Sequence, residues 1–195
     1  MTTSSDRRLF EKYLSILGCD RKEPSLEGLR ELVEAQLTRV PFESLSKIYY
    51  KKHEGLTALP GLERYLDGIE RFGFGGTCYA NNIHLGQLLT HLGYRTRLCS
   101  ADMSQPDVHI VNMIDVDGRE YIVDAGYAAP FLEPLPRDLT TNHVIELGRD
   151  RYVLHPQDGN GCSRVDLHRE GQLIHGYLAK PDPRTMEDFE LVYPL

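Results

Sequence analysis

The chain has 195 residues and a net charge of −7, and its 41% hydrophobic and 26% charged residues are ordinary for a globular protein of one domain or two small lobes. Acidic and basic residues are mixed without a lysine or arginine block, which argues against nucleic acid as a partner. No apolar run is long enough to cross a bilayer and the first residues lack a secretory signal, so we expect a cytoplasmic protein with no membrane partner.

Helical patterns dominate the first 92 residues. A first amphipathic helix is expected over residues 6–17. A second is expected over residues 24–39, which end before a Val-Pro pair, because a residue that precedes proline avoids the helical region. Residues 41–45 favour a turn, and a third helix is expected over residues 60–71.

A glycine-rich turn, residues 73–77, leads into a fourth expected helix. Apolar residues recur at helical spacing from Asn81 to Leu92, and Gly93 supplies a stop. Cys78 would then sit in or near the first turn, where unsatisfied backbone N–H groups stabilise a thiolate. The alternative is a small core residue, which is the commonest role of free cysteine. Cys78 is therefore a candidate nucleophile that needs a base elsewhere.

The composition changes to β-forming residues after the fourth helix. Strands are expected over residues 94–101, 108–116 and 120–124. Asp117–Gly118 marks a hairpin between the last two, so we expect an antiparallel sheet. Further strands are expected at residues 142–147, 151–154, 163–168 and 172–178, with a loop over 128–136.

This pattern divides the chain into three parts. Residues 1–92 form a helical domain that carries the nucleophile, and residues 93–180 form an antiparallel β domain. Residues 181–195 are polar and interrupted by proline, so we expect a C-terminal tail.

The cysteine spacing argues against a disulfide scaffold or a structural zinc site, because the four cysteines are scattered without a C-x-x-C pair. Cys162 with His155 and His168 is a conceivable ligand set, but its spacing matches no known site, and surface strand positions are the simpler explanation. We expect no metal.

His109 is the candidate base, since it lies in an expected strand among β-branched neighbours. Counting outward from the Asp117–Gly118 turn puts residue 124 opposite residue 111, so Asp124 is a cross-strand diagonal neighbour of His109. Taken singly, a half-buried strand histidine and a turn aspartate are the alternatives. Together with Cys78 they supply the nucleophile, base and orienting carboxylate that acyl transfer by a thiol requires.

These residues lie in segments that resemble the arylamine N-acetyltransferases. GGTCYANN at residues 75–82 is similar to the family signature R-G-G-x-C-[FY]-E-x-N, and VPFESL at residues 40–45 is similar to [IV]-P-F-E-N-L. YIVDAGY at residues 121–127, followed by PLP at 134–136, resembles Y-[LI]-V-D-V-G-F-G-x-x-x-P-L-P, and His109 falls at the family's catalytic histidine. The four segments occur in the family's order.

The resemblance implies an α+β fold. A helical bundle would pack on an antiparallel β-barrel or sheet around a cysteine-protease-like (transglutaminase-like) core, with an α/β lid as a third domain. It also implies ping-pong transfer from acetyl-coenzyme A to an arylamine or hydrazine through acetylated Cys78, with His109 and Asp124 completing the triad. The substrate-binding residues expected on this basis are Phe42, Gly76, Thr77, Tyr79, Gly126 and Tyr127.

The chain departs from the family pattern in several places. Phe74 stands where the signature has arginine and Ala80 where it has glutamate, a joint change that avoids leaving one buried charge unpaired. Ser44 replaces the asparagine of the second motif. Residues 186–190 resemble the start of the third domain and the sequence ends five residues later, so we expect a short relative that lacks most of the lid.

Three readings stay open at this point. The first is the acetyltransferase, with a small-molecule amine and an acyl thioester as partners. The second keeps the triad but releases the acyl group differently, as a thioester hydrolase or an amide synthase. The third is an inactive relative that binds a partner through an exposed apolar surface. A homo-oligomer, in which a second subunit supplies the part of the site that the missing lid would form, is a further candidate.

Overall fold

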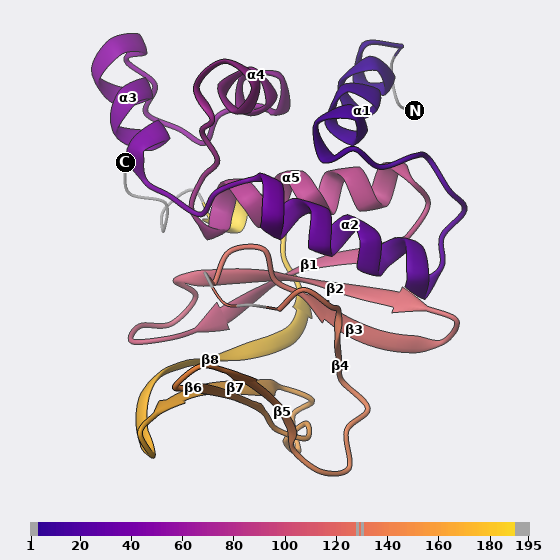
Figure 1. The fold of residues 1–195 in the computed structure, drawn as a ribbon, viewed down its shortest axis with the longest axis vertical. Helices are drawn as coiled ribbons and strands as arrows, with labels where there is room; N and C mark the ends of the chain where they lie inside the picture. The colour runs from indigo at the N-terminus through magenta and orange to yellow at the C-terminus, as the bar shows by residue number, and fades with distance from the viewer. Residues whose placement is uncertain (1–3, 128, 130, 190–195) are drawn as a thin grey trace.

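The protein is described by a computed structural model that covers residues 4–127, 129 and 131–189. The helices are α1 (Ser4–Leu17), α2 (Leu26–Arg39), α3 (Leu45–Glu54), α4 (Leu62–Phe72), α5 (Cys78–His91) and the short 3₁₀ helix η1 (Glu187–Phe189). The strands are β1 (Arg95–Asp102), β2 (His109–Val116), β3 (Arg119–Val123), β4 (Leu135–Pro136), β5 (His143–Leu147), β6 (Asp150–Leu154), β7 (Ser163–Arg169) and β8 (Gln172–Pro183). Helices precede strands along the chain, which confirms the expected α+β class (Figure 1).

Local signals account for the bounds of most helices. The hydroxyl of Ser25 caps α2 by accepting a hydrogen bond from the backbone N–H of Gly28 at 3.0 Å, and the helix ends at the residue before Val40–Pro41. α5 starts at Cys78 itself, so the expected position of this cysteine in the first helical turn is confirmed. Gly73 adopts a left-handed conformation that ends α4 and opens the turn before Cys78.

Helix α3 is missing from the sequence-based prediction, which gives only a turn over residues 41–45. Its apolar residues Leu45 and Ile48 are exposed, so the helix has no buried stripe whose period would reveal it. Its first turn is held instead by the carboxylate of Glu43, which accepts a hydrogen bond from the backbone N–H of Ser46 at 2.9 Å.

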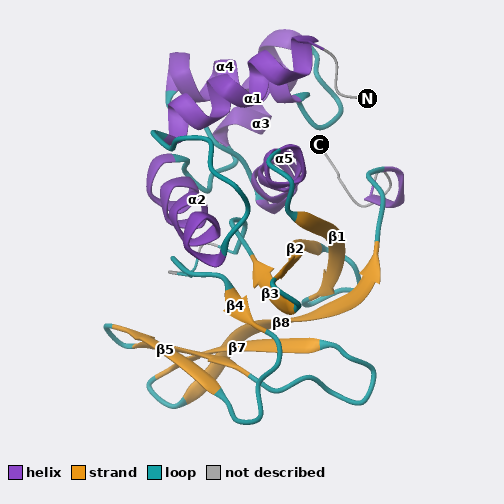
Figure 2. Cartoon of the chain, turned by 90° about the vertical axis from the view of Figure 1, so that its right-hand side faces the viewer, coloured by secondary structure: helices purple, strands orange, loops and turns teal. Residues whose placement is uncertain are grey.

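The eight strands form one antiparallel sheet in the order β4-β3-β2-β1-β8-β7-β6-β5. β1 is the junction, since it pairs with β2 on one side and β8 on the other. The sheet curls at this junction, so that β1–β4 lie against the helical layer and β5–β8 form the opposite end of the molecule (Figures 1 and 2). Among the described strands, β4 and β5 are unjoined edges, so the sheet is an open half-barrel.

Two strand predictions need correction. β4 lies inside the expected loop 128–136, where it pairs with β3 through Ile122 and Leu135. β8 runs beyond the expected end of the β domain at residue 180, because Pro183 lies opposite Cys99 of β1. The expected tail therefore begins as a strand, and Phe189 in η1 is buried; residues 190–195 lie outside the described part of the chain.

The helical and β parts share a hydrophobic core. One cluster combines helical residues such as Leu66 and Leu85 with Ile114 and Val123 of the sheet. A second cluster, which includes Phe131, fills the space between the two halves of the sheet. α5 thus lies between the other helices and the sheet, and its first residue is positioned by both.

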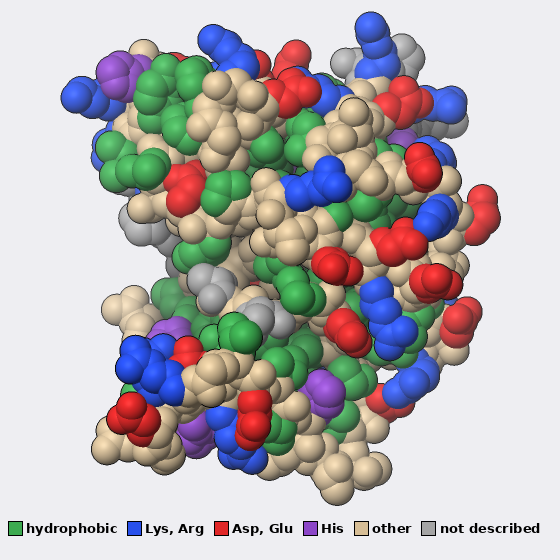
Figure 3. Space-filling view, viewed as in Figure 1, with side chains coloured by type: hydrophobic (Ala, Val, Ile, Leu, Met, Phe, Trp, Pro, Cys, Tyr) green, Lys and Arg blue, Asp and Glu red, His purple; other side chains and the backbone are tan. Residues whose placement is uncertain are grey.

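The face of the molecule shown in Figure 3 carries intermixed positive and negative side chains. It is indented between the helical layer and the β5–β8 half of the sheet, on the left of Figure 3. None of the described helices has the length and apolar character needed to span a membrane.

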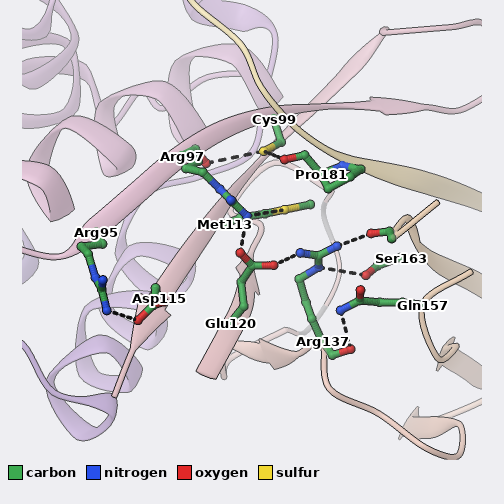
Figure 4. Close-up of polar contacts among 11 residues, drawn as sticks. Arg95, Arg97, Cys99, Met113, Asp115, Glu120, Arg137, Gln157, Ser163 and Pro181 are labelled. Carbon is green, nitrogen blue, oxygen red and sulfur yellow. Dashed lines mark hydrogen bonds and ion pairs between the residues drawn. The ribbon is translucent and has the colours of Figure 1, made fainter. Parts of the chain in front are cut away.

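Arg137 ties the two halves of the sheet together. Its guanidinium is buried, pairs with the carboxylate of Glu120 on β3 and donates from Nε to the hydroxyl of Ser163 on β7 at 3.1 Å (Figure 4). Its carbonyl oxygen accepts a hydrogen bond from the Gln157 side chain at 2.9 Å. A buried charge is stable only when it is paired in this way, so the curl of the sheet is held by a polar contact as well as by the core.

Candidate active site

Cys78 follows a turn that only glycine can make. A Cβ on Gly75 would collide with the carbonyl oxygen of Pro41, and one on Gly76 would lie 2.5 Å from the Cβ of Ala80. The backbone N–H of Gly76 also donates to the carbonyl of Pro41 at 3.2 Å. The Cys78 side chain is half-buried, so its thiol is held at the N-terminus of α5 and stays open to solvent.

His109 and Asp124 form a buried hydrogen-bonded pair. The Nε2 atom of His109 lies 2.8 Å from Oδ2 of Asp124. Asn112 of β2 pairs with Val123 of β3, so residue 111 falls opposite residue 124, as the count from the hairpin turn predicts. His109 begins β2 and Asp124 directly follows β3, and the diagonal contact across the hairpin brings them together.

Asn82 holds the carboxylate of Asp124 in place. Its Nδ2 donates to Oδ1 of Asp124 at 3.0 Å and to the carbonyl of Ile110 at 2.7 Å, and its Oδ1 accepts from the backbone N–H of Ala125 at 2.8 Å. The backbone N–H of Gly126 adds a further hydrogen bond to the carboxylate at 2.9 Å. The family signature contains Asn82, but sequence reasoning assigned it no role, because its partners lie on other elements.

Asn81 fastens the glycine turn to the helical layer. Its Nδ2 donates to the carbonyl of Gly76 at 3.1 Å, and its Oδ1 accepts from the hydroxyl of Tyr65 at 3.0 Å. Tyr65 belongs to α4 and in turn accepts from the side-chain amide of Gln36 on α2 at 3.2 Å. The turn that carries the thiol is therefore braced by a buried polar chain across two helices.

Burial and charge act in opposite directions on the His–Asp pair. Burial by itself lowers the pKa of His109, but the Asp124 carboxylate attracts the imidazolium, and hydrogen bonds with Asp124 and Cys78 add to this, so the pKa is raised. For Asp124, burial by itself raises the pKa, but the charge and hydrogen bond of His109, with those of a side-chain amide and a backbone N–H, lower it. The pair is thus an imidazolium–carboxylate pair at neutral pH.

Gly126 allows the loop after β3 to approach Cys78 closely. A Cβ at this position would lie 2.6 Å from the Cβ of Cys78 and 2.7 Å from Nδ2 of Asn82. Gly126 was expected to bind substrate, and its place in the structure is against the backbone of the candidate nucleophile. Any larger residue would push the loop away from the thiol.

Four rings next to His109 form an aromatic wall, which consists of Tyr127, Phe131, His175 and Tyr177. Tyr127 lies at its centre, with its ring 5.9 Å from that of His109, stacked with Phe131 at 5.9 Å and edge-on to Tyr177 at 5.0 Å. The expected substrate residue Tyr127 is therefore brought beside the His–Asp pair.

Tyr177 is a residue that sequence reasoning missed. Its ring is buried 5.1 Å from that of His109, and it reaches the site from β8, in the other half of the sheet. Burial raises the pKa of its phenol well above the ordinary value, and the nearby charge of Asp124 raises it further. The phenol is neutral at physiological pH. No local pattern distinguishes Tyr177 from other strand tyrosines.

The remaining expected substrate residues occupy different positions. Phe42 is exposed and forms a parallel bridge with Gly76, so it lies at the glycine turn. Thr77 is half-buried at the N-cap of α5. Tyr79 is drawn into a separate buried cluster with Phe189, and its hydroxyl donates to the carbonyl of Asp107 at 3.3 Å.

Glu43 keeps two partners although Phe74 replaces the arginine of the family signature. One carboxylate oxygen accepts from the backbone N–H of Gly75 at 3.0 Å, and the other caps α3. Phe74 packs among aromatic side chains that include Tyr49, Tyr50 and Phe72. Backbone donors thus satisfy the acid where an arginine is absent, and Phe74 contributes packing alone.

A second His–Asp pair lies elsewhere in the sheet. Nε2 of His155 on the β6 side is 3.0 Å from Oδ2 of Asp166 on β7, and Nε of Arg164 reaches the other oxygen at 2.8 Å. In the part of the chain that is described, no group of three or more histidine, cysteine or acidic residues could hold a metal ion. Cys162, His155 and His168 are thus not assembled as a ligand set.

The arrangement around Cys78 has the chemistry of nucleophilic catalysis. The thiol lies at a helix N-terminus, and its interaction with His109 is among the contributions that raise the pKa of that imidazole. Because Nε2 of His109 is taken by Asp124, its other ring nitrogen is the one available to the thiol. The site therefore contains a nucleophile (Cys78), a group that can carry its proton (His109) and a carboxylate that orients this group (Asp124).

Comparison with known proteins points to one family. A family model described as N-acetyltransferase matches residues 25–193. Arylamine N-acetyltransferase 2 of Homo sapiens is 29% identical over 92% of this chain and 69% of its own length. The arylamine N-acetyltransferase of Mycobacterium abscessus shares the fold, with a TM-score of 0.77 and 19% identity over 94% of this chain and 67% of that one. The Mycobacterium marinum protein in complex with CoA shares it with a TM-score of 0.73 and 24% identity, over 94% and 69%.

Proposed function

Since the chain belongs to the arylamine N-acetyltransferase family of acyltransferases, we propose that it transfers an acetyl group from acetyl-coenzyme A to an arylamine or hydrazine through an acetyl-Cys78 intermediate. The observation that carries the proposal is the buried His109–Asp124 pair at 2.8 Å, together with a thiol at the start of α5 whose interaction helps to raise the pKa of His109. The CoA bound by the Mycobacterium marinum relative supports the choice of donor.

The first half-reaction acetylates the thiol. The Cys78 thiol passes its proton to His109, and the resulting thiolate Sγ attacks the carbonyl carbon of the thioester while the bond from that carbon to the coenzyme sulfur breaks. The imidazolium of His109 gives its proton to the departing coenzyme thiolate. The raised pKa of His109 keeps this proton on the ring until the leaving group needs it. Negative charge on the carbonyl oxygen develops near the N-terminus of α5, where backbone N–H groups stabilise it.

The second half-reaction returns the enzyme to its starting state. The nitrogen of the amine attacks the acetyl carbon, the carbon–sulfur bond to Cys78 breaks, and the now neutral His109 takes the proton from the amine. Asp124 keeps the imidazole oriented through both steps and stabilises its charged form. Asn82 and the Gly126 backbone hold Asp124 for this task.

Mass spectrometry of the intact protein tests the proposal. Incubation with acetyl-coenzyme A should add one acetyl group, located on Cys78 by peptide mapping, and Cys78→Ala should abolish the adduct. Cys162→Ala is the matched control, since Cys162 is also half-buried but directly precedes β7, which is separated from β2 by β1 and β8 in the sheet, and its adduct should equal that of the wild type. Absence of an acetyl adduct on the wild-type protein would overturn the proposal.

A second measurement separates transfer from hydrolysis. With aniline present, the acetyl adduct should decay as acetanilide forms. Without amine, the adduct should persist for much longer than one turnover takes with aniline. Release of acetate at the same rate with and without amine would instead support the thioester hydrolase alternative.

A further inference from the structure

We propose that His175 is a specificity-determining residue that, together with Tyr127, selects arylamine acceptors with a hydrogen-bond acceptor on the ring carbon opposite the amine. This inference rests on the proposed transfer of acetyl groups to arylamines and concerns the acceptor alone. It assigns a role to a histidine on β8 that neither the triad nor the family motifs include.

The contact between Tyr127 and His175 joins the two halves of the sheet beside the candidate triad. The hydroxyl of Tyr127 lies 2.9 Å from Nδ1 of His175, and the two rings are stacked at 5.6 Å with 22° between their planes. Tyr127 stands in the loop after β3, whereas His175 belongs to β8. The family motif has phenylalanine where this chain has Tyr127. The Tyr127 hydroxyl and its contact with His175 are therefore not part of the motif.

The direction of this hydrogen bond and the tautomer of His175 are linked. When the Tyr127 hydroxyl donates to Nδ1, the neutral imidazole has its hydrogen on Nε2, and the proposed role requires this tautomer. Among the described residues nothing accepts a hydrogen bond from Nε2, and the side chain is exposed. His175 therefore presents an N–H donor at the solvent edge of the aromatic wall.

The wall leads from the reacting atoms to this donor. The Tyr127 ring lies 5.9 Å from the ring of His109 and 5.6 Å from the ring of His175. Tyr127 is half-buried, so part of its ring is open to a ligand. An arylamine whose nitrogen meets acetyl-Cys78 beside His109, and whose ring lies along Tyr127, directs its opposite substituent towards His175. A carbonyl in that position accepts the Nε2–H hydrogen bond, and an alkyl group cannot.

Two acceptors of nearly equal shape test this inference. 4-Aminoacetophenone carries a carbonyl opposite the amine, and 4-isopropylaniline carries an alkyl group of similar size. The measurement is the ratio of their kcat/KM values at saturating acetyl-coenzyme A. His175→Phe keeps a flat ring in the wall but removes Nε2–H, and it should lower the ratio about fivefold. Tyr127→Phe should lower it about twofold, because nothing then holds the proton on Nε2.

The matched control is His143→Phe, an exposed histidine on β5, which should leave the ratio unchanged. If wild-type Cys78 is acetylated and His175→Phe keeps the wild-type ratio, the inference is wrong while the proposed function stands. If His175→Phe slows both amines equally, the residue only positions Tyr127 and the specificity role is also wrong. If wild-type Cys78 forms no acetyl adduct, the inference and the proposed function fall together.

Discussion

Two histidine–aspartate pairs lie in the same sheet with similar geometry and different surroundings. The joined atoms are 2.8 Å apart in His109–Asp124 and 3.0 Å apart in His155–Asp166. The side chains of the first pair are 2% and 0% exposed, whereas those of the second are 34% and 10% exposed. A hydrogen-bond distance therefore does not by itself identify a catalytic pair.

The two pairs also differ in the hydrogen-bond donors that surround each carboxylate. Asp124 is held by a buried amide and a backbone N–H, and the Cys78 thiol contributes to the raised pKa of its histidine. Asp166 is instead shared with Arg164, whose side chain is half exposed, and water screens the charges there. Low dielectric surroundings strengthen every interaction of the first pair, so substitutions in the two places should differ in size.

The largest difference is expected in turnover. Asp124→Asn should lower kcat/KM for acetyl transfer to aniline about a thousandfold, because the neutral amide no longer stabilises the imidazolium or selects its orientation. Asp166→Asn should leave kcat/KM within about twofold of wild type. Steady-state kinetics of both variants checks this, and equal losses would show that the buried surroundings of Asp124 have no catalytic importance.

The next effect concerns stability. Asn82→Ala should lower the free energy of unfolding by about 3 kcal/mol, because it leaves the Ala125 N–H and the Ile110 carbonyl buried without partners. Arg164→Ala removes the second donor of the His155–Asp166 pair, whose arginine is half exposed, and should cost less than about 1 kcal/mol. Urea unfolding at neutral pH measures both, and similar losses would contradict the proposed difference between the pairs.

A smaller effect is expected from close packing against the thiol. Gly126→Ala should cost about 2 kcal/mol, because the added Cβ meets Cys78 and the loop must shift. Gly159→Ala is the control, since a Cβ there meets nothing within 4 Å, and it should change stability by less than about 0.5 kcal/mol. Unfolding curves that shift equally for the two variants would show that the contact at Cys78 is not tight.

The last expected effect is a pH dependence. The raised pKa of His109 means that its contribution to stability is complete below the unfolded-state pKa of about 6.5 and is lost as pH rises through the folded-state pKa. Above about pH 6.5 the wild type should therefore lose stability relative to the double variant His109→Gln/Asp124→Asn, by at most about 1.4 kcal/mol per pH unit. Unfolding free energies from pH 6 to 9 measure this difference.

A wild-type profile parallel to that of the His109/Asp124 double variant would show that the buried pair is not ionised as described.

Local sequence signals predicted most of the fold. The starts and ends of α2 and α5 follow from capping residues, proline and glycine, which act through their immediate neighbours. α3 escaped prediction because its aliphatic side chains Leu45 and Ile48 stay exposed, and β4 because a two-residue strand exists only through its pairing with β3. The end of β8 likewise depends on β1, which lies far away along the chain.

The sequence by itself determined the candidate triad, because a two-residue turn sets the register that brings His109 to Asp124, and a glycine turn puts Cys78 at a helix start. Its catalytic role stays a prediction. Only the tertiary structure decided what surrounds it: Asn82 on the carboxylate, and Tyr177 and His175 from the far half of the sheet. These contacts join segments that no local pattern relates, since burial and the curl of the sheet arise only when the whole chain packs.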